Sequence, residues 1–269
     1  MSPRLAGCGA EMLFRTPPFC RPTALERRIL ARAEASLMPY GGGRLALWTW
    51  GRGPAVLLVH GWGGHAGRLG NFVGPLLDAG CSVIAFDAPG HGASSGLQGS
   101  LPELIDALRA LDDRHGQFHG VIGHSLGASA AALAMRNGLR TPRAVFLAPP
   151  ADMSWYVSRF ARRLRLSRRI RERLQRRLER RYGLCWERMC VASVVGDRQA
   201  KLLVFHDAGD SSVPLSDGEA IARAWPGARL VRTHGLGHHR ILRDRRVVAR
   251  ATAFVAQGAR VESLEADAV

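Results

Sequence analysis

Ser125 is the residue whose setting most directly suggests chemistry. It lies in the segment Gly123-His124-Ser125-Leu126-Gly127, which follows the apolar residues 121–122 and precedes the alanine-rich stretch 128–136. This order predicts a buried strand, a tight turn and a helix, because the glycines let the two backbones approach closely. A serine on such a turn projects toward the helix N-terminus, where the positive end of the helix dipole favours developing negative charge. The pattern therefore predicts a nucleophilic serine.

A nucleophilic serine needs a neighbouring base that takes its proton. The segment Gly235-Leu236-Gly237-His238-His239 follows the last expected strand, residues 229–232, and its glycines allow a loop that reaches over the serine. An imidazole suits this role because its reference pKa of about 6.5 lets it take and return a proton near neutral pH. We expect His238 to be the base, with His239 as the next candidate and His234 as the third.

The base in turn needs a carboxylate that orients its ring. Asp207 and Asp210 both lie in the polar turn that follows the apolar residues 202–205 and ends at Pro214. Asp210 is the preferred candidate because it lies beyond Gly209, in the loop itself, and Asp207 is the reserve. Serine, acid and histidine then follow one another in this order along the chain.

A glycine-rich loop after an earlier apolar run is a candidate for holding a developing oxyanion. Leu58-Val59-His60-Gly61-Trp62-Gly63-Gly64 allows a backbone N–H to turn toward the serine, and we assign this role to Trp62 together with the N–H of Leu126. Two such donors make an oxyanion hole. The alternative is a simple glycine turn with Trp62 facing the core. His60, Gly61 and His124 are expected to line the substrate pocket.

The elements that must position these residues alternate between strands and helices. Short apolar runs bounded by glycine or proline are typical of strands buried on both faces of a parallel sheet. They occupy residues 55–59, 82–86, 121–122, 144–147 and 202–205, after an alternating strand at 44–50, with helices expected at 102–111 and 128–136. The pattern predicts a doubly wound sheet, whose sites lie at the carboxyl ends of its strands.

The N-terminal residues show no such pattern. Residues 1–22 contain proline and glycine without periodicity, and we expect a loose arm there. Thr23-Ala24-Leu25-Glu26 is a capping box, which predicts a short helix that extends to about Ser36.

Residues 151–199 differ from the rest of the chain in their charge. Residues 151–200 contain fourteen arginines and five acidic residues, so more than half of the net charge of +16 lies there. Ile170, Leu174, Leu178 and Tyr182 recur every four residues among eight arginines, which predicts an amphipathic helix with a narrow apolar stripe. We expect this stripe to be a packing face that covers the mouth of the active site.

Together these segments resemble the α/β-hydrolase superfamily, specifically its small serine hydrolases, over residues 44–150 and 200–255. Residues 86–94, Phe-Asp-Ala-Pro-Gly-His-Gly-Ala-Ser, are similar to a D-x-P-G-x-G-x-S segment of that family. The resemblance implies that this segment is structural, so Asp87 and His91 are not expected to be catalytic. It also implies an α/β-hydrolase fold with a mostly parallel doubly wound sheet and a helical lid inserted after the sixth strand.

The expected organisation is one domain with an insert. An N-terminal arm and short helix occupy residues 1–40, the core 41–150 and 200–260, the arginine-rich lid 151–199, and a tail 261–269. Five cysteines without a CxxC pair argue against a disulfide framework, and the N-terminus lacks the apolar stretch of a signal peptide, so we expect a cytoplasmic protein. No cofactor is expected, and no metal site, because zinc-binding motifs such as HExxH do not occur.

Three functions are compatible with these features. The leading hypothesis is a hydrolase that cleaves a small or medium acyl ester through an acyl-enzyme on Ser125. A second is a thioesterase or esterase whose acyl group arrives on coenzyme A or an acidic carrier protein docked at the basic lid. The third is a non-catalytic protein that binds an anionic membrane or nucleic acid, with nucleic acid the less favoured partner. The sequence leaves the oligomeric state open.

Overall fold

A mixed sheet forms the centre of the molecule. The computed structural model describes residues 3–183, 189–191 and 200–259, and within them eight strands pair in the order β1-β2-β4-β3-β5-β6-β7-β8. The strands are β1 (Glu34–Tyr40), β2 (Gly43–Trp50), β3 (Ala55–Val59), β4 (Ser82–Phe86), β5 (Gly120–His124), β6 (Arg143–Leu147), β7 (Lys201–Asp207) and β8 (Arg229–Thr233). β2 runs antiparallel to β1 and β4, and the pairs from β4 to β8 are parallel, so the predicted fold is confirmed.

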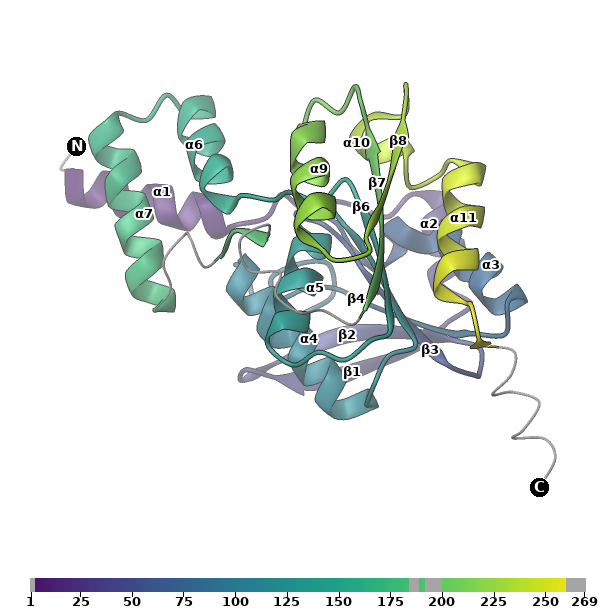
Figure 1. Ribbon diagram of the computed structural model, residues 1–269. Helices are drawn as coiled ribbons and strands as arrows, with labels where there is room; N and C mark the ends of the chain where they lie inside the picture. Colours follow the sequence, from purple (N-terminus) through teal and green to yellow (C-terminus); the bar gives the residue numbers. More distant parts are fainter. Residues whose placement is uncertain (1–2, 184–188, 192–199, 260–269) are drawn as a thin grey trace.

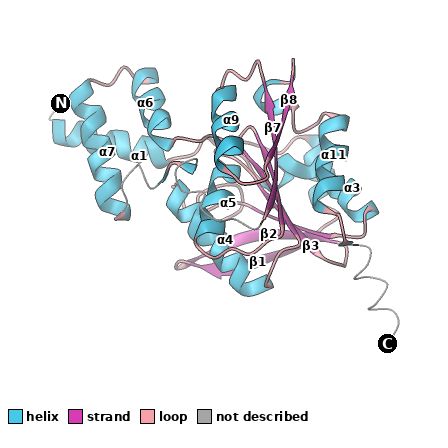
Figure 2. Ribbon diagram, in the orientation of Figure 1, coloured by secondary structure: helices cyan, strands magenta, loops and turns pink. Residues whose placement is uncertain are grey.

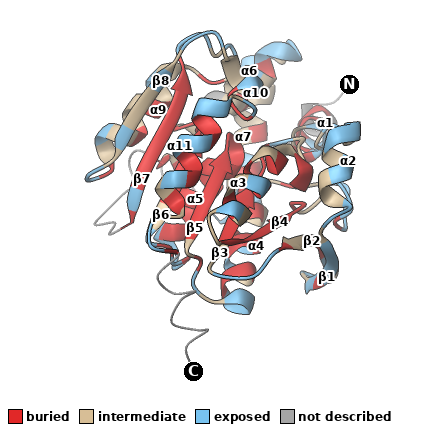
Figure 3. Cartoon of the chain, turned by 90° about the vertical axis from the view of Figure 1, so that its right-hand side faces the viewer, coloured by how far each residue is buried: buried red, intermediate tan, exposed pale blue. Residues whose placement is uncertain are grey.

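The central strands are buried on both faces, as their continuous apolar runs predict. Every residue of β4 and β5 is buried, as are the last four of β3 and of β6 (Figure 3). The predicted bounds of the strands at 55–59 and 82–86 are those of β3 and β4. Two apolar clusters, one on each side of the sheet, make up the core.

Helices cover both faces of the sheet (Figures 1 and 2). One face carries α4 (Leu101–His115), α5 (Leu126–Arg136) and α9 (Leu215–Ala224). The other face carries α2 (Ala24–Leu30), the 3-10 helix η1 (Ala66–Phe72), α3 (Val73–Asp78) and α11 (Arg245–Val255). The short helix α10 (Gly237–Arg240) follows β8. None of the described helices is both long enough and apolar enough to span a membrane.

The N-terminal segment differs from the predicted loose arm. Pro3–Arg15 forms helix α1, which packs against the insert, so the expectation of a loose arm is wrong for these residues. The capping box at Thr23 and Glu26 is present, but its helix ends at Leu30. Glu34–Tyr40 pairs with β2 as edge strand β1, which includes residues expected to be helical.

The insert lies between β6 and β7 and is helical. It contains α6 (Met153–Arg163) and α7 (Arg168–Tyr182), which form a group with α1 at one end of the molecule (Figure 1). Leu174 and Leu178 of the predicted apolar stripe are buried, with Ile170 and Tyr182 partly buried beside them. Residues 184–188 and 192–199 of the predicted lid, and the tail 261–269, lie outside the described residues.

Ion pairs join α1 to the arginine face of α7. Glu11 of α1 is buried and accepts hydrogen bonds from Arg177 Nε at 2.6 Å and Arg181 Nε at 2.5 Å. Phe14 of α1 also packs edge-on against Phe160 of α6, with ring centroids 5.2 Å apart. Part of the arginine face is thus bound within the molecule, and α1 supports the insert.

Candidate active site

Ser125 lies on the turn between β5 and α5, at the carboxyl edge of the sheet. Its backbone has φ 52° and ψ −127°, a conformation that a residue with a side chain rarely adopts. The surrounding fold fixes this conformation, because the Ser125 N–H donates to the carbonyl of Leu147 on β6 at 2.9 Å. The serine is therefore presented at the N-terminus of α5, as its sequence pattern predicts.

The two glycines of the pentapeptide are required by close contacts. A Cβ at Gly123 would lie 2.6 Å from Cα of Ala128, and one at Gly127 would lie 2.4 Å from the carbonyl oxygen of His60. Real Cβ atoms do not approach other atoms this closely. The glycines thus let α5 pack directly against β5 and against the loop after β3.

Ser125, His238 and Asp210 form a continuous hydrogen-bonded chain. His238 Nε2 lies 3.0 Å from Ser125 Oγ, and His238 Nδ1 lies 2.7 Å from Asp210 Oδ2. These distances fit a ring that donates from Nδ1 to the carboxylate and accepts the serine proton at Nε2. The structure thus brings together the three residues preferred on sequence grounds. His234 and His239 are exposed and make no hydrogen bond to the serine.

Asp210 is held as a carboxylate by its loop. Its side chain is fully buried, and Oδ1 accepts from the backbone N–H groups of Ser212 at 2.7 Å and Val213 at 3.0 Å. Burial opposes ionisation, but the hydrogen bonds from His238 and these N–H groups outweigh it and lower the pKa of Asp210. The carboxylate is therefore charged at neutral pH and can orient the imidazole.

Asp207, the reserve candidate, lies between the loop that carries Asp210 and the loop that carries His238. It is fully buried, and Oδ2 accepts from Thr233 Oγ1 and from the N–H of Leu236, both at 2.9 Å, while Oδ1 accepts from the N–H of Gly209 at 3.0 Å. The carboxylate that is hydrogen-bonded to His238 is that of Asp210, not that of Asp207. The Asp207 carboxylate instead joins the loop of the acid to the loop of the histidine, a role that the sequence analysis missed.

The loop after β3 passes directly over the serine. A Cβ at Gly61 would lie 2.9 Å from Ser125 Cβ, so only glycine allows this approach. The next residue, Trp62, carries the predicted N–H, and its side chain is 37% exposed, which does not fit the alternative of a core-facing tryptophan. Leu126 is the first residue of α5, where a backbone N–H has no partner within the helix.

Buried histidines fix this loop. His60 Nδ1 donates to the carbonyl of Gly61 at 2.8 Å, and its Nε2 accepts from the N–H of Ala88 at 2.9 Å. Burial lowers the pKa of His60 to about 3, so the ring is neutral. His91 accepts from the N–H of Gly63 at 3.1 Å. Both nitrogens of His60 are thus bound to backbone, so the ring positions the loop and offers a substrate no free ring nitrogen.

His124, also expected in the pocket, contacts His238. It is buried, its Nε2 donates to the carbonyl of His238 at 2.9 Å, and the two rings lie 4.8 Å apart. Burial and the neighbouring His238 ring hold the pKa of His124 well below its usual value. The described residues contain no cluster of three or more His, Cys, Asp or Glu placed to hold a metal ion.

This architecture has counterparts among known proteins. The sequence matches the family described as "Serine aminopeptidase, S33" over residues 53–253. The chain belongs to this family of α/β hydrolases. An esterase of Pyrococcus furiosus has a similar fold, with a TM-score of 0.65 and 19% identity, over 91% of this α/β hydrolase and 98% of that chain.

Two relatives match a shorter part of this α/β hydrolase. A pimeloyl-[acyl-carrier protein] methyl ester esterase of Methylococcus capsulatus is 42% identical over 89 residues, which are 33% of this chain and 34% of that protein. A monoacylglycerol lipase of Mycolicibacterium smegmatis is 34% identical over 108 residues, 36% of this chain and 39% of that protein. The matches thus span between a third and two fifths of these relatives.

Proposed function

We propose that this α/β hydrolase cleaves a carboxylic ester of a small or medium acyl group through an acyl-enzyme on Ser125. The observation that carries the proposal is the hydrogen-bonded chain from Asp210 through His238 to Ser125, with distances of 2.7 and 3.0 Å. The ester-cleaving activities named for the two relatives above support the same reaction class.

The proposed reaction follows from the positions of these groups. His238 Nε2 takes the proton of Ser125 Oγ as the oxygen attacks the ester carbonyl, and Asp210 stabilises the imidazolium that forms. The N–H groups of Trp62 and Leu126 bind the oxyanion of the tetrahedral intermediate. His238 then gives its proton to the leaving alcohol. Water, activated by the same imidazole, releases the acid and restores Ser125.

Turnover of p-nitrophenyl esters from acetate to laurate tests the proposal. We expect wild-type protein to hydrolyse short or medium esters and Ser125→Ala to lose about 10³-fold or more in kcat. Ser216→Ala is the matched control, because Ser216 is exposed on α9 and is not one of the proposed site residues. Equal turnover by wild type and Ser125→Ala would refute the assignment.

A second candidate substrate is an acyl group borne by an acidic carrier. The supporting observation is a group of exposed arginines on and after α6 and along α7 that make no ion pair with another described residue: Arg162, Arg163, Arg165, Arg169, Arg176 and Arg180. We call this group the basic insert surface. An acidic partner is attracted to such a surface, and salt screens the attraction.

Salt dependence separates the two substrate classes. With a carrier-linked substrate, kcat/KM falls steeply between about 0.05 and 0.3 M salt, whereas kcat/KM for a neutral p-nitrophenyl ester changes little. Replacement of Arg169, Arg176 and Arg180 by glutamine lowers kcat/KM only for the carrier-linked substrate. Equal salt dependence for both substrates would exclude docking at the basic insert surface.

A further inference from the structure

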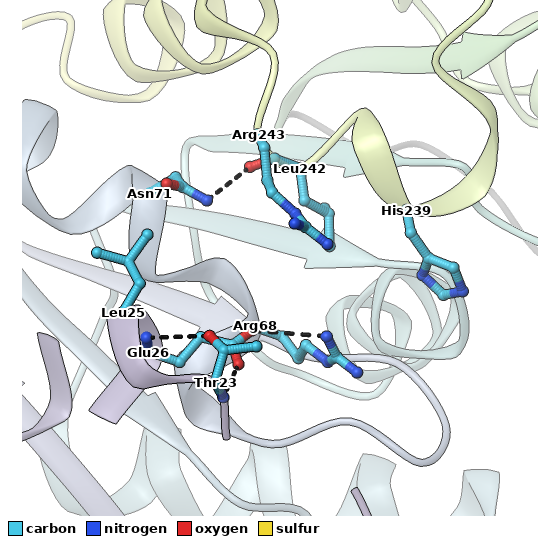
Figure 4. Close-up of a pocket in the computed structure, with 8 residues that line it drawn as sticks. All are labelled: Thr23, Leu25, Glu26, Arg68, Asn71, His239, Leu242 and Arg243. Atoms are coloured by element: carbon cyan, nitrogen blue, oxygen red, sulfur yellow. Dashed lines mark hydrogen bonds and ion pairs between the residues drawn. The ribbon is translucent and has the colours of Figure 1, made fainter. Parts of the chain in front are cut away.

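A polar cleft opens beside His238, the proposed base. It lies between the start of α2, helix η1 and the segment from α10 to α11, and Figure 4 shows its walls. The lining residues are Thr23, Leu25, Glu26, Arg68, Asn71, His239, Leu242 and Arg243. We refer to it as the Arg68–Arg243 cleft. None of its residues takes part in the proposed chemistry at Ser125.

The cleft carries an excess of positive charge. Arg68 lies 3.5 Å from the Glu26 carboxylate, so this pair is largely neutral. Arg243, by contrast, is exposed and makes no ion pair with any other described residue, and its side chain extends into the cleft from the opposite wall (Figure 4). Burial and the charges of His238, Arg68 and Arg243 lower the pKa of His239. An anion in the cleft would therefore meet one uncompensated guanidinium.

The cleft adjoins the histidine that would give its proton to a leaving group. His239 follows His238 directly, and their rings lie 5.0 Å apart. His238 must give its proton to the leaving alcohol, so that alcohol leaves on the histidine side of Ser125. The alcohol portion of a bound ester is therefore the part of the substrate that faces this cleft.

The size of the cleft fits a small anionic group. Its volume is about 50 Å³ on a scale on which one water molecule needs about 10–15 Å³. This leaves space for about three to five atoms of the size of oxygen. A carboxylate has three such atoms, and guanidinium groups bind it through charge-assisted hydrogen bonds.

We infer that the Arg68–Arg243 cleft binds a carboxylate on the alcohol portion of the ester. The inference rests on the proposed function, which it makes more specific. Arg243 supplies the unpaired cation, Arg68 and Asn71 line the cleft from η1, and His239 lines it beside His238. The preferred substrate is thus the acyl ester of a hydroxy acid.

Two esters of matched shape test this inference. The butyryl esters of 4-hydroxybenzoate and 4-hydroxybenzamide differ in the charge of the leaving group, and release of either phenol is followed by absorbance. We expect wild-type protein to show the higher kcat/KM for the carboxylate ester, and Arg243→Gln to lower that value about 5-fold while the amide ester changes less than about 2-fold. Arg250→Gln, which removes an exposed arginine of α11 outside the cleft, leaves both values unchanged.

The outcomes separate this inference from the proposed function. If the amide ester is hydrolysed but wild type shows no preference for the carboxylate, or if Arg243→Gln affects both esters equally, the carboxylate site is refuted and the esterase proposal stands. If neither ester is hydrolysed, the binding of the two esters to the Ser125→Ala variant, measured by calorimetry, tests the carboxylate site. Tighter binding of the carboxylate ester that Arg243→Gln weakens supports the site, and equal binding of both esters refutes it.

Discussion

Replacement of Asp207 by asparagine tests whether this buried carboxylate positions the catalytic loops. The substitution keeps the shape of the side chain but removes its charge and turns one acceptor oxygen into an NH2 group. Oδ1 receives the N–H of Gly209, and Oδ2 receives the Thr233 hydroxyl and the N–H of Leu236. The NH2 group of asparagine must replace one of these two oxygens. A donor that was bound to that oxygen then faces a second donor, and its hydrogen bond is lost.

The magnitude follows from the bonds that are lost. A hydrogen bond to a charged group contributes about 1.5–3 kcal/mol, so losing one or two of them destabilises the fold by about 1.5–6 kcal/mol. Because Leu236 precedes His238 by two residues, the loss also displaces the imidazole, and a displacement near 1 Å costs about 10²-fold in rate. We expect kcat of Asp207→Asn to fall about 10- to 100-fold, with KM nearly unchanged.

Comparison with Asp210→Asn separates the positioning role of Asp207 from the role of the triad acid. Loss of the orienting carboxylate in a serine triad typically lowers kcat about 10⁴-fold while the fold remains stable. Turnover of a p-nitrophenyl ester and thermal unfolding are measured for both variants. We expect Asp207→Asn to lose more stability and Asp210→Asn to lose more activity. A reversed order for activity would show that Asp207 is the acid and that the arrangement at Asp210 is misassigned.

Two substitutions away from the reacting atoms test the fold. Glu11→Gln removes the charge between Arg177 and Arg181, and since both arginines remain partly exposed we expect a loss of about 1–2 kcal/mol, or about 2–4 °C in Tm. The arginines lower the pKa of Glu11 despite its burial. The stabilisation of the fold by the Glu11 carboxylate is therefore fully present above the unfolded pKa of about 4.3, and it is lost as pH falls through the folded pKa. The difference in Tm should therefore shrink below about pH 4, and a constant difference would contradict this origin. Gly92→Ala would place a Cβ 1.9 Å from Asp87 Oδ2 at a φ of +51°, so we expect the free energy of unfolding to fall by about 2–4 kcal/mol. Gly74→Ala is the control, because its Cβ would meet no atom within 4 Å. This control should leave Tm unchanged or slightly raised.

The parts of the fold that the sequence predicts well are those with strong local patterns. β3 and β4 were predicted at their observed bounds because their apolar runs end at turns on both sides. The serine turn was predicted because its glycines are required by contacts within the same unit of strand, turn and helix. In these segments local sequence and tertiary packing agree.

The parts that the sequence did not predict depend on distant partners. Helix α1 contains two glycines, and its packing against α6 and α7, through Phe14 and Glu11, stabilises it. β1 is exposed at most positions, so it shows no alternation, and its pairing with β2 determines its conformation. The roles of His60 and Asp207 also depend on loops that are remote in sequence, because each joins backbone groups from two loops.

Covalent labelling tests the central claim, that Ser125 is a nucleophile activated by His238, most directly. A fluorophosphonate reacts with an activated serine, whose oxygen displaces fluoride and forms a stable phosphonate ester. Intact mass and peptide mapping should show one adduct per chain of wild-type protein, on Ser125, and greatly slowed labelling of His238→Ala. Absence of an adduct on Ser125, or equal labelling of wild type and His238→Ala, would contradict the claim.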